Sequence, residues 1–118
     1  MAIPHAESGE VMDVRPLGER IQQRGTTTLC KTDTLEVLRL VLPAGTQLPR
    51  HQVAGEITVH CLEGRVVFDA GGTDRELTAC KMLFLSGGTP HALRAEENSS
   101  VLVTILLRHK SSVGQTPE

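Results

Sequence analysis

Short runs of apolar or alternating residues, each followed by turn residues, repeat along the chain from about residue 26. Glycine, proline and asparagine separate the runs at intervals of about ten residues, and no long stretch has helical periodicity. This spacing is typical of an antiparallel β-sandwich or β-barrel, so we predict an all-β fold. The dipeptide Glu63-Gly64 predicts a tight hairpin between two of the strands. The expected strands cover residues 26–31, 35–42, 51–53, 56–62, 65–68, 76–79, 82–85, 91–95 and 101–108.

The two ends of the chain are less regular than its middle. Residues 11–17 are compatible with an edge strand that ends at Pro16, and residues 18–24 with a single helical turn. The last residues are polar and are expected to be flexible. The chain therefore divides into an N-terminal segment over 1–25, a single barrel domain over 26–109 and a tail over 110–118.

The stretch EITVHCLEG, residues 56–64, shows which side chains point into the barrel. Successive residues of a strand point to opposite faces of the sheet, and the apolar set is the natural inner face. The inner face then carries Ile57, Val59 and Cys61. The outer face carries Glu56, Thr58, His60 and Leu62.

The stretch LEVLRLVL, residues 35–42, is apolar on both faces, although a strand of a small barrel needs only one apolar face. One face carries Leu35, Val37 and Val41, and the other carries Leu38, Leu40 and Leu42. The last strand repeats the pattern, with Val101, Val103, Ile105 and Leu107 on one face and Leu102 and Leu106 on the other. Large exposed apolar patches are rare on monomers. The second face therefore predicts a homodimer that forms by sheet-on-sheet contact.

Composition and charge limit the classes of partner. The 118 residues carry a net charge of −2, which gives no positively charged surface for nucleic acid or anionic lipid. The N-terminus has no apolar stretch of signal-peptide length, and no run is long enough to span a membrane. We therefore expect a soluble, cytoplasmic protein with no nucleic-acid or membrane partner.

The three cysteines lack the spacing of a metal site or a disulfide framework. Cys30, Cys61 and Cys80 are odd in number and form no C-x-x-C pair. Each lies among apolar residues, so we expect all three to act as small buried apolar side chains in a reducing compartment.

Two glycine–histidine motifs resemble those of the cupin superfamily. The first cupin motif is G-x5-H-x-H-x3–4-E-x6-G, and this chain matches it at Gly45, His51 and Gly64, with Val53 and Ile57 in place of the second histidine and the glutamate. The second motif is G-x5-P-x-G-x2-H-x3-N. This chain keeps its Gly88 and His91, and Cys80, Ser86 and Ala95 replace the glycine, proline and asparagine. The resemblance covers residues 35–107 and implies an antiparallel double-stranded β-helix, or jelly-roll barrel.

The resemblance also implies a site inside the barrel. Cupin metals are held by three imidazoles and a carboxylate, of which this chain keeps His51 and His91, expected to face each other across the cavity. These two are the candidate metal ligands or polar groups of the pocket. The other pocket residues would be apolar: Val53, Ile57, Val59 and Cys61.

Further metal ligands depend on the register of the strand over 56–62. A one-residue bulge would turn Glu56 and His60 inward, but it would expel Ile57 and its apolar neighbours, so the unshifted register is favoured. Cys61, on the inner face, is a third candidate. The cofactor therefore stays open between none and a divalent transition metal such as Fe, Mn, Ni or Zn. His5 and His109 are expected on the surface.

Three functions remain at this stage. The first is small-molecule binding in an apolar barrel pocket with His51 and His91 as its polar groups. The second is a metal-dependent oxygenase or lyase that acts on a small organic acid. The third, metal-free acid–base catalysis as in sugar epimerases of the same fold, is the weakest, because those enzymes use a tyrosine and this chain has none. The sequence assigns no catalytic residue.

Overall fold

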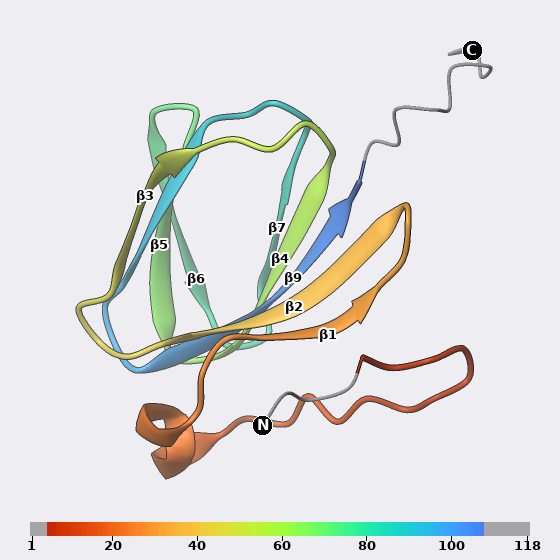
Figure 1. Cartoon of the computed structure of the whole chain (residues 1–118). Coiled ribbons are helices and arrows are strands. Elements are labelled where there is room, and N and C mark those ends of the chain that lie inside the picture. The colour runs from red at the N-terminus through yellow and green to blue at the C-terminus, as the bar shows by residue number, and fades with distance from the viewer. Residues whose placement is uncertain (1–4, 108–118) are drawn as a thin grey trace, which may run out of the picture.

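Two antiparallel sheets face each other and enclose the core, which confirms the all-β prediction (Figure 1). The computed structural model describes residues 5–107. The first sheet has the order β1-β2-β9-β4-β7 and the second the order β3-β8-β5-β6. The strands are β1 (Thr27–Lys31), β2 (Leu35–Leu42), β3 (Gln47–His51), β4 (Ile57–Glu63), β5 (Arg65–Ala70), β6 (Thr73–Thr78), β7 (Met82–Leu85), β8 (His91–Ala95) and β9 (Ser99–Leu106).

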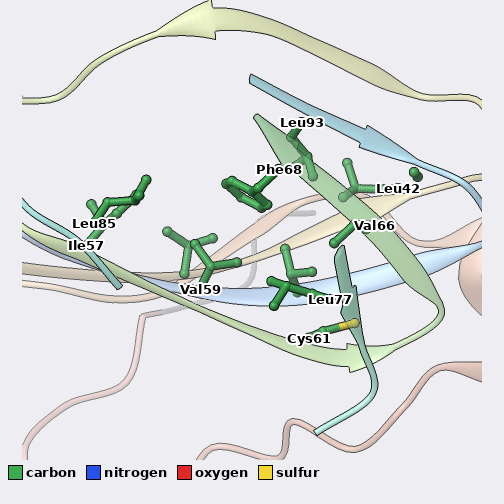
Figure 2. Close-up of a cluster of buried hydrophobic side chains, with 12 residues drawn as sticks. Leu42, Ile57, Val59, Cys61, Val66, Phe68, Leu77, Leu85 and Leu93 are labelled. Atoms are coloured by element: carbon green, nitrogen blue, oxygen red, sulfur yellow. The ribbon is translucent and has the colours of Figure 1, made fainter. Parts of the chain in front are cut away.

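The core lies between the two sheets and is built from alternate residues of each strand. In β4, Ile57, Val59 and Cys61 are buried and point toward Val66 and Phe68 of β5 (Figure 2). Ile57 pairs with Leu85 of β7 and with Ile105 of β9, so β4 enters the sheet in the unshifted register. The expected division of residues 56–62 into an inner and an outer face is therefore confirmed.

The hairpin expected at Glu63-Gly64 does not form. β4 belongs to the first sheet and β5 to the second, so Gly64 is a corner at which the chain passes between sheets. Its φ is +89°, a backbone conformation that favours glycine. The dipeptide Glu63-Gly64 fits both structures, because a corner between two sheets and a hairpin turn each need a residue with positive φ.

Two other strand bounds differ from the prediction. β3 begins at Gln47 and includes Pro49, where we expected a turn followed by a strand over 51–53. Proline is tolerated there because β3 is an edge strand. β6 begins at Thr73, within a segment that we expected to be a long turn; the turn consists only of Gly71 and Gly72, both with positive φ.

An N-terminal strap, residues 5–25, lies against the outer face of the first sheet near β1 and β2 (Figure 1). It contains a 3-10 helix, η1 (Gly18–Gln23), at the place of the expected helical turn. Leu17 and Ile21 are buried with Val41 of β2. Part of the apolar second face of β2 is therefore covered by the chain itself.

The edge strand expected over 11–17 is absent, because side chains of the sheet bind the backbone of the strap. Arg39 of β2 donates from Nη2 to the Arg15 carbonyl at 2.6 Å and also to the Val14 carbonyl. The Glu63 carboxylate accepts hydrogen bonds from Leu17 N and Gly18 N, both at 2.9 Å. Backbone groups that would pair with a neighbouring strand are thus bound by the side chains of Arg39 and Glu63. These two side chains and the strap backbone that they bind are called the latch below.

Charges at the latch are partly buried. Arg39 is only 8% exposed, and burial lowers the pKa of its guanidinium, although Glu63 and Asp13 oppose that shift. Burial by itself would raise the pKa of Glu63. Hydrogen bonds from Leu17 N, the Ser100 hydroxyl and Gly18 N outweigh it and leave that pKa below its ordinary value. The latch therefore holds Glu63 as a carboxylate.

The cysteines differ from one another in exposure. Within residues 5–107 all three are free, as the odd count suggested, but only Cys61 is buried. Cys80 is exposed in the turn between β6 and β7, with φ of +73°, which corrects the expectation that all three are buried. None of the helices within the described range has the length and hydropathy needed to cross a bilayer. The tail over 110–118 and His109 lie outside the described residues.

Candidate functional site

His51 and His91 meet at neighbouring strands of the second sheet. They are cross-strand partners at the ends of β3 and β8, after a register shift in β3 between Leu48 and His51. Their ring centroids are 4.4 Å apart with an interplanar angle of 59°. We expected the two rings to face each other across the cavity, but they lie side by side on one wall, because β3 and β8 are adjacent in the sheet.

A hydrogen bond from Nδ1 to a backbone carbonyl two residues earlier orients each of the two rings. His51 Nδ1 lies 3.0 Å from the Pro49 carbonyl oxygen, and His91 Nδ1 lies 2.9 Å from the Thr89 carbonyl oxygen. A carbonyl only accepts hydrogen bonds, so Nδ1 carries the proton in each ring. In the neutral form Nε2 is then an unprotonated acceptor on both imidazoles. The pair offers two acceptor nitrogens to a ligand.

The rings differ in burial. His91 is 5% exposed and is stacked on Phe68 at a centroid distance of 6.2 Å, whereas His51 is exposed. Phe68 belongs to β5, which pairs with β8, so the ring of His91 is held between a backbone carbonyl and an aromatic face. His91 is the fixed member of the pair and His51 the member nearer to solvent.

A cavity of about 140 Å³ opens beside the histidines. Apart from the two imidazoles its walls are apolar, and both sheets contribute to them. Its volume is close to the roughly 150 Å³ of an apolar cavity that holds benzene. The lining residues are Leu38, Leu40, Leu48, His51, Val53, Ile57, Val59, Phe68, His91, Leu93, Val103 and Ile105.

The loop after β3 and the loop before β8 are closely packed beside the cavity. Gly88 N donates to the Val53 carbonyl at 2.8 Å, which joins the loop after β3 to the loop before β8. Gly55 is buried, and a Cβ placed on it would lie 1.7 Å from the Leu106 carbonyl oxygen. Such close backbone approach is possible only for glycine. The stretch that carries Val53 into the cavity wall is therefore fixed from two sides.

The remaining candidate residues lie away from this pair. Glu56 is exposed and does not line the cavity, and His60 is on the outer face of β4 opposite Met82. Cys61 is buried on the inner face, but at the end of β4 remote from Ile57, where its Sγ donates to the Glu63 carbonyl at 3.4 Å (Figure 2). Of the expected pocket residues, Val53, Ile57 and Val59 line the cavity and Cys61 does not.

Several cavity residues were not named from the sequence. Leu38 and Leu40 come from β2, and Val103 and Ile105 from β9. All four occupy alternate positions of apolar strands, so the period-two pattern marks them as inward-facing. That pattern does not separate the residues around a cavity from those of the solid core. Leu48 was not recognised as a strand residue, because Pro49 next to it is typical of a turn.

The similarity of this chain to known proteins lies in its structure. No protein-family model and no curated protein matches the sequence. A conserved protein of unknown function from Streptococcus pyogenes is similar with a TM-score of 0.71 and 20% identity, over 92% of this chain and 96% of that one. A cupin superfamily protein from Desulfitobacterium hafniense gives a TM-score of 0.71 at 16% identity, over 87% of this chain and all of that one. The chain has the cupin fold.

A third cupin-fold neighbour is a predicted oxalate decarboxylase from Thermotoga maritima. It is 24% identical, with a TM-score of 0.63, over 70% of this chain and 79% of that one. Likeness at this level of identity establishes the shared architecture, in which two antiparallel sheets form the double-stranded β-helix of the cupin fold. The same fold carries many chemistries, so function must be argued from the cavity itself.

The donor set of this cupin fold does not fit a metal ion. Transition metals in proteins usually have at least three protein ligands, as in the two-histidine-one-carboxylate arrangement. Within residues 5–107 no group of three or more histidine, cysteine, aspartate or glutamate side chains could hold one. The positions of the second histidine and the glutamate of the cupin motif carry Val53 and Ile57, which line the cavity as apolar walls. Within the described residues, His51 and His91 therefore lack the further ligands that a transition metal needs.

Proposed function

We propose that the protein binds a small, mostly apolar molecule in the barrel cavity and uses His51 and His91 to accept hydrogen bonds from it. The observation that carries this proposal is the pair of Nδ1-to-carbonyl contacts, which leaves Nε2 of each neutral ring as an acceptor beside an otherwise apolar cavity. Pockets of this composition take up a ligand through apolar contact and orient it by a few polar groups.

Size and polarity narrow the ligand class. The cavity of about 140 Å³ accommodates a body of about the size of benzene. Two neutral acceptor nitrogens favour a ligand that donates a hydrogen bond, such as a phenol or a small alcohol. A carboxylate has no proton to donate, and its charge would lose hydration against the apolar walls. A small phenol is therefore the preferred class over a small organic acid.

The test compares phenol, benzene and benzoate by chemical-shift titration at mildly alkaline pH. One net hydrogen bond is worth about 0.5–1.5 kcal/mol, so phenol should bind about 2- to 13-fold more tightly than benzene. Benzoate should bind most weakly. Failure of both phenol and benzene to bind at millimolar concentration would refute the proposal.

The matched control is a third imidazole of the same chain. His91→Ala and His51→Ala should each reduce the ratio of phenol affinity to benzene affinity, and this ratio is insensitive to a change in cavity size. His60→Ala removes a ring on the outer face of β4 and should leave the ratio unchanged. An equal ratio in wild type and in both cavity variants would show that the histidines do not contact the ligand.

The alternative is a metal-dependent oxygenase or lyase that acts on a small organic acid. The metal content of the wild type and of the same two histidine variants distinguishes it from the binding proposal. Elemental analysis of untagged protein should find no stoichiometric Fe, Mn, Ni or Zn. Near-stoichiometric metal that is lost in both His51→Ala and His91→Ala would overturn the binding proposal in favour of the enzyme.

A further inference from the structure

A second cavity, called here the strap cavity, lies where the strap passes over the outer face of β1 and β2 (Figure 1). Its volume is about 300 Å³, and it shares no lining residue with the barrel cavity. Leu29 of β1 and Val41 of β2 line it from the sheet, and Val11, Met12 and Leu17 line it from the strap. Val11 and Met12 are exposed. The strap cavity is therefore a separate, partly apolar site that the strap leaves open.

A buried arginine of the latch also lines the strap cavity. Arg39 is 8% exposed, and its Nη2 is used by two backbone carbonyls of the strap. Its Nε is buried and has no hydrogen-bond partner, and within residues 5–107 it is the one buried side-chain nitrogen or oxygen in this state. A buried donor of a charged group is costly to leave without an acceptor. An unpartnered donor beside an open cavity indicates that a ligand supplies the acceptor.

Arg24 brings a second guanidinium to the same cavity. Burial is the largest influence on the pKa of Arg39 and lowers it; the charges of Glu63 and Asp13 raise that pKa, and the charge of Arg24 lowers it further. The two arginines are thus close enough to repel each other. Neither of them belongs to an ion pair within the described residues. An anion between them would oppose both the repulsion and the loss of hydration.

The acidic side chains around the strap cavity are bound to other groups. The Asp13 carboxylate accepts hydrogen bonds from Arg15 Nε at 2.9 and 3.1 Å and forms an ion pair with Arg15 Nη2 at 2.8 Å. Glu10 Oε1 accepts a hydrogen bond from Glu7 N at 2.7 Å. Glu63 is held by the backbone of the strap in the latch. The carboxylates of the chain therefore leave the two arginines of the strap cavity to an external anion.

We propose that the strap cavity binds a small amphipathic carboxylic acid, with its carboxylate between Arg39 and Arg24 and its apolar chain against the strap and the sheet. Hydrogen bonds between guanidinium and carboxylate are charge-assisted and are among the strong ones in proteins. The apolar walls favour an acid with a hydrocarbon chain over inorganic phosphate, which has no apolar part and is strongly hydrated.

The size of the strap cavity sets the length of the acid. An apolar cavity of about 150 Å³ holds benzene, so about 300 Å³ accommodates roughly twice as many non-hydrogen atoms. Hexanoate is well within this limit. This site offers hydrogen-bond donors, whereas the histidines of the barrel cavity offer acceptors, so the two sites favour different ligands. The inference for the strap cavity does not rest on the proposed function of the barrel.

The experiment is isothermal titration calorimetry on the full chain at neutral pH and low salt. Hexanoate should bind about 13- to 160-fold more tightly than hexan-1-ol, the range that one net hydrogen bond to a charged group supplies. Acetate, which lacks the chain, and inorganic phosphate should both bind more weakly than hexanoate. Equal affinity for hexanoate and hexan-1-ol would overturn the proposal, and tighter binding of phosphate would overturn the ligand class.

Three arginine variants locate the bound acid. Arg39→Gln should reduce the affinity for hexanoate to that for hexan-1-ol. Arg24→Gln keeps the latch and should weaken hexanoate about 2- to 5-fold, because Arg24 is exposed and exposed ion pairs are weak. Arg20→Gln is the matched control, because Arg20 is an exposed arginine of η1 that does not line the strap cavity, and it should leave the affinity unchanged.

Far-UV circular dichroism and thermal unfolding verify that each variant is folded. If Arg39→Gln does not fold, Arg24→Gln against Arg20→Gln still decides the question. Hexanoate affinity equal to wild type in Arg24→Gln would overturn the proposed site. His91→Ala should leave hexanoate binding unchanged, and its loss in that variant would place the acid in the barrel cavity instead.

Discussion

Substitution of Gly64 by alanine tests whether the corner between the two sheets depends on close packing as well as on backbone conformation. The residue has φ of +89°, and a Cβ placed on it would lie 2.2 Å from Ser99 Oγ, 2.3 Å from the Asn98 carbonyl oxygen and 2.7 Å from Ser99 Cα. Ser99 is fully buried and is held by hydrogen bonds to Arg65 N and to the Glu97 carbonyl. The neighbours of Gly64 therefore cannot move away at low cost.

The expected loss of stability has two parts. A left-handed backbone conformation costs an alanine about 1–2 kcal/mol. Overpacking of a tightly packed site adds about 1–3 kcal/mol. Gly64→Ala should thus lower the free energy of unfolding by about 2–5 kcal/mol in total. Gly72 is the matched control, because its φ is +92° and nothing lies within 4 Å of a Cβ placed on it. Gly72→Ala should show only the backbone part.

Urea unfolding followed by far-UV circular dichroism measures the difference between the two variants. The chain has no Trp or Tyr, so intrinsic fluorescence is not a suitable probe. Both variants should keep the wild-type m-value, and the midpoint should fall further for Gly64→Ala than for Gly72→Ala. At roughly 3–5 °C per kcal/mol, the melting temperatures should differ by about 3–15 °C. Equal losses, within about 0.5 kcal/mol, would refute the packing argument.

Two further predictions concern titratable groups outside the cavity. Because the pKa of Glu63 in the folded protein lies below its ordinary value of 4.5, its stabilisation is present above that pH and is lost as the pH falls through the lower folded value. Glu63→Gln should therefore flatten the acid limb of urea midpoint against pH, and an unchanged limb would contradict the latch. Burial raises the pKa of the Cys61 thiol above 9.0, whereas Cys80 is exposed. Iodoacetamide at neutral pH should modify Cys80 first, and peptide mass mapping that finds Cys61 modified equally fast in folded protein would be inconsistent with this burial.

The inner and outer faces of the strands were predictable because they depend on local alternation. Ile57, Val59 and Cys61 were assigned to the inner face from a period of two, and the structure buries all three. The predicted strand bounds were wrong where one local sequence feature is compatible with two different structures. Gly64 resembles a hairpin turn but is a corner, and Pro49 resembles a turn residue but lies in an edge strand.

The candidate site was only partly predictable. His51 and His91 were identified from motif spacing, and the structure brings their rings to a centroid distance of 4.4 Å. Their position on one wall could not be read from the sequence, since it depends on the adjacency of β3 and β8, whose residues lie far apart in the chain. The apolar second face of β2 was visible in the sequence, but its partial coverage by Leu17 and Ile21 was not.

The sequence by itself determined an all-β chain, the inner face of most strands and the two histidines between apolar neighbours. These features follow from the side-chain alternation of a pleated strand and from the residue types that turns require. Only the tertiary structure decided which strands are neighbours and which part of the outer sheet face the strap covers. Those outcomes depend on burial and hydrogen bonding between residues distant in the chain, such as Glu63 with Leu17.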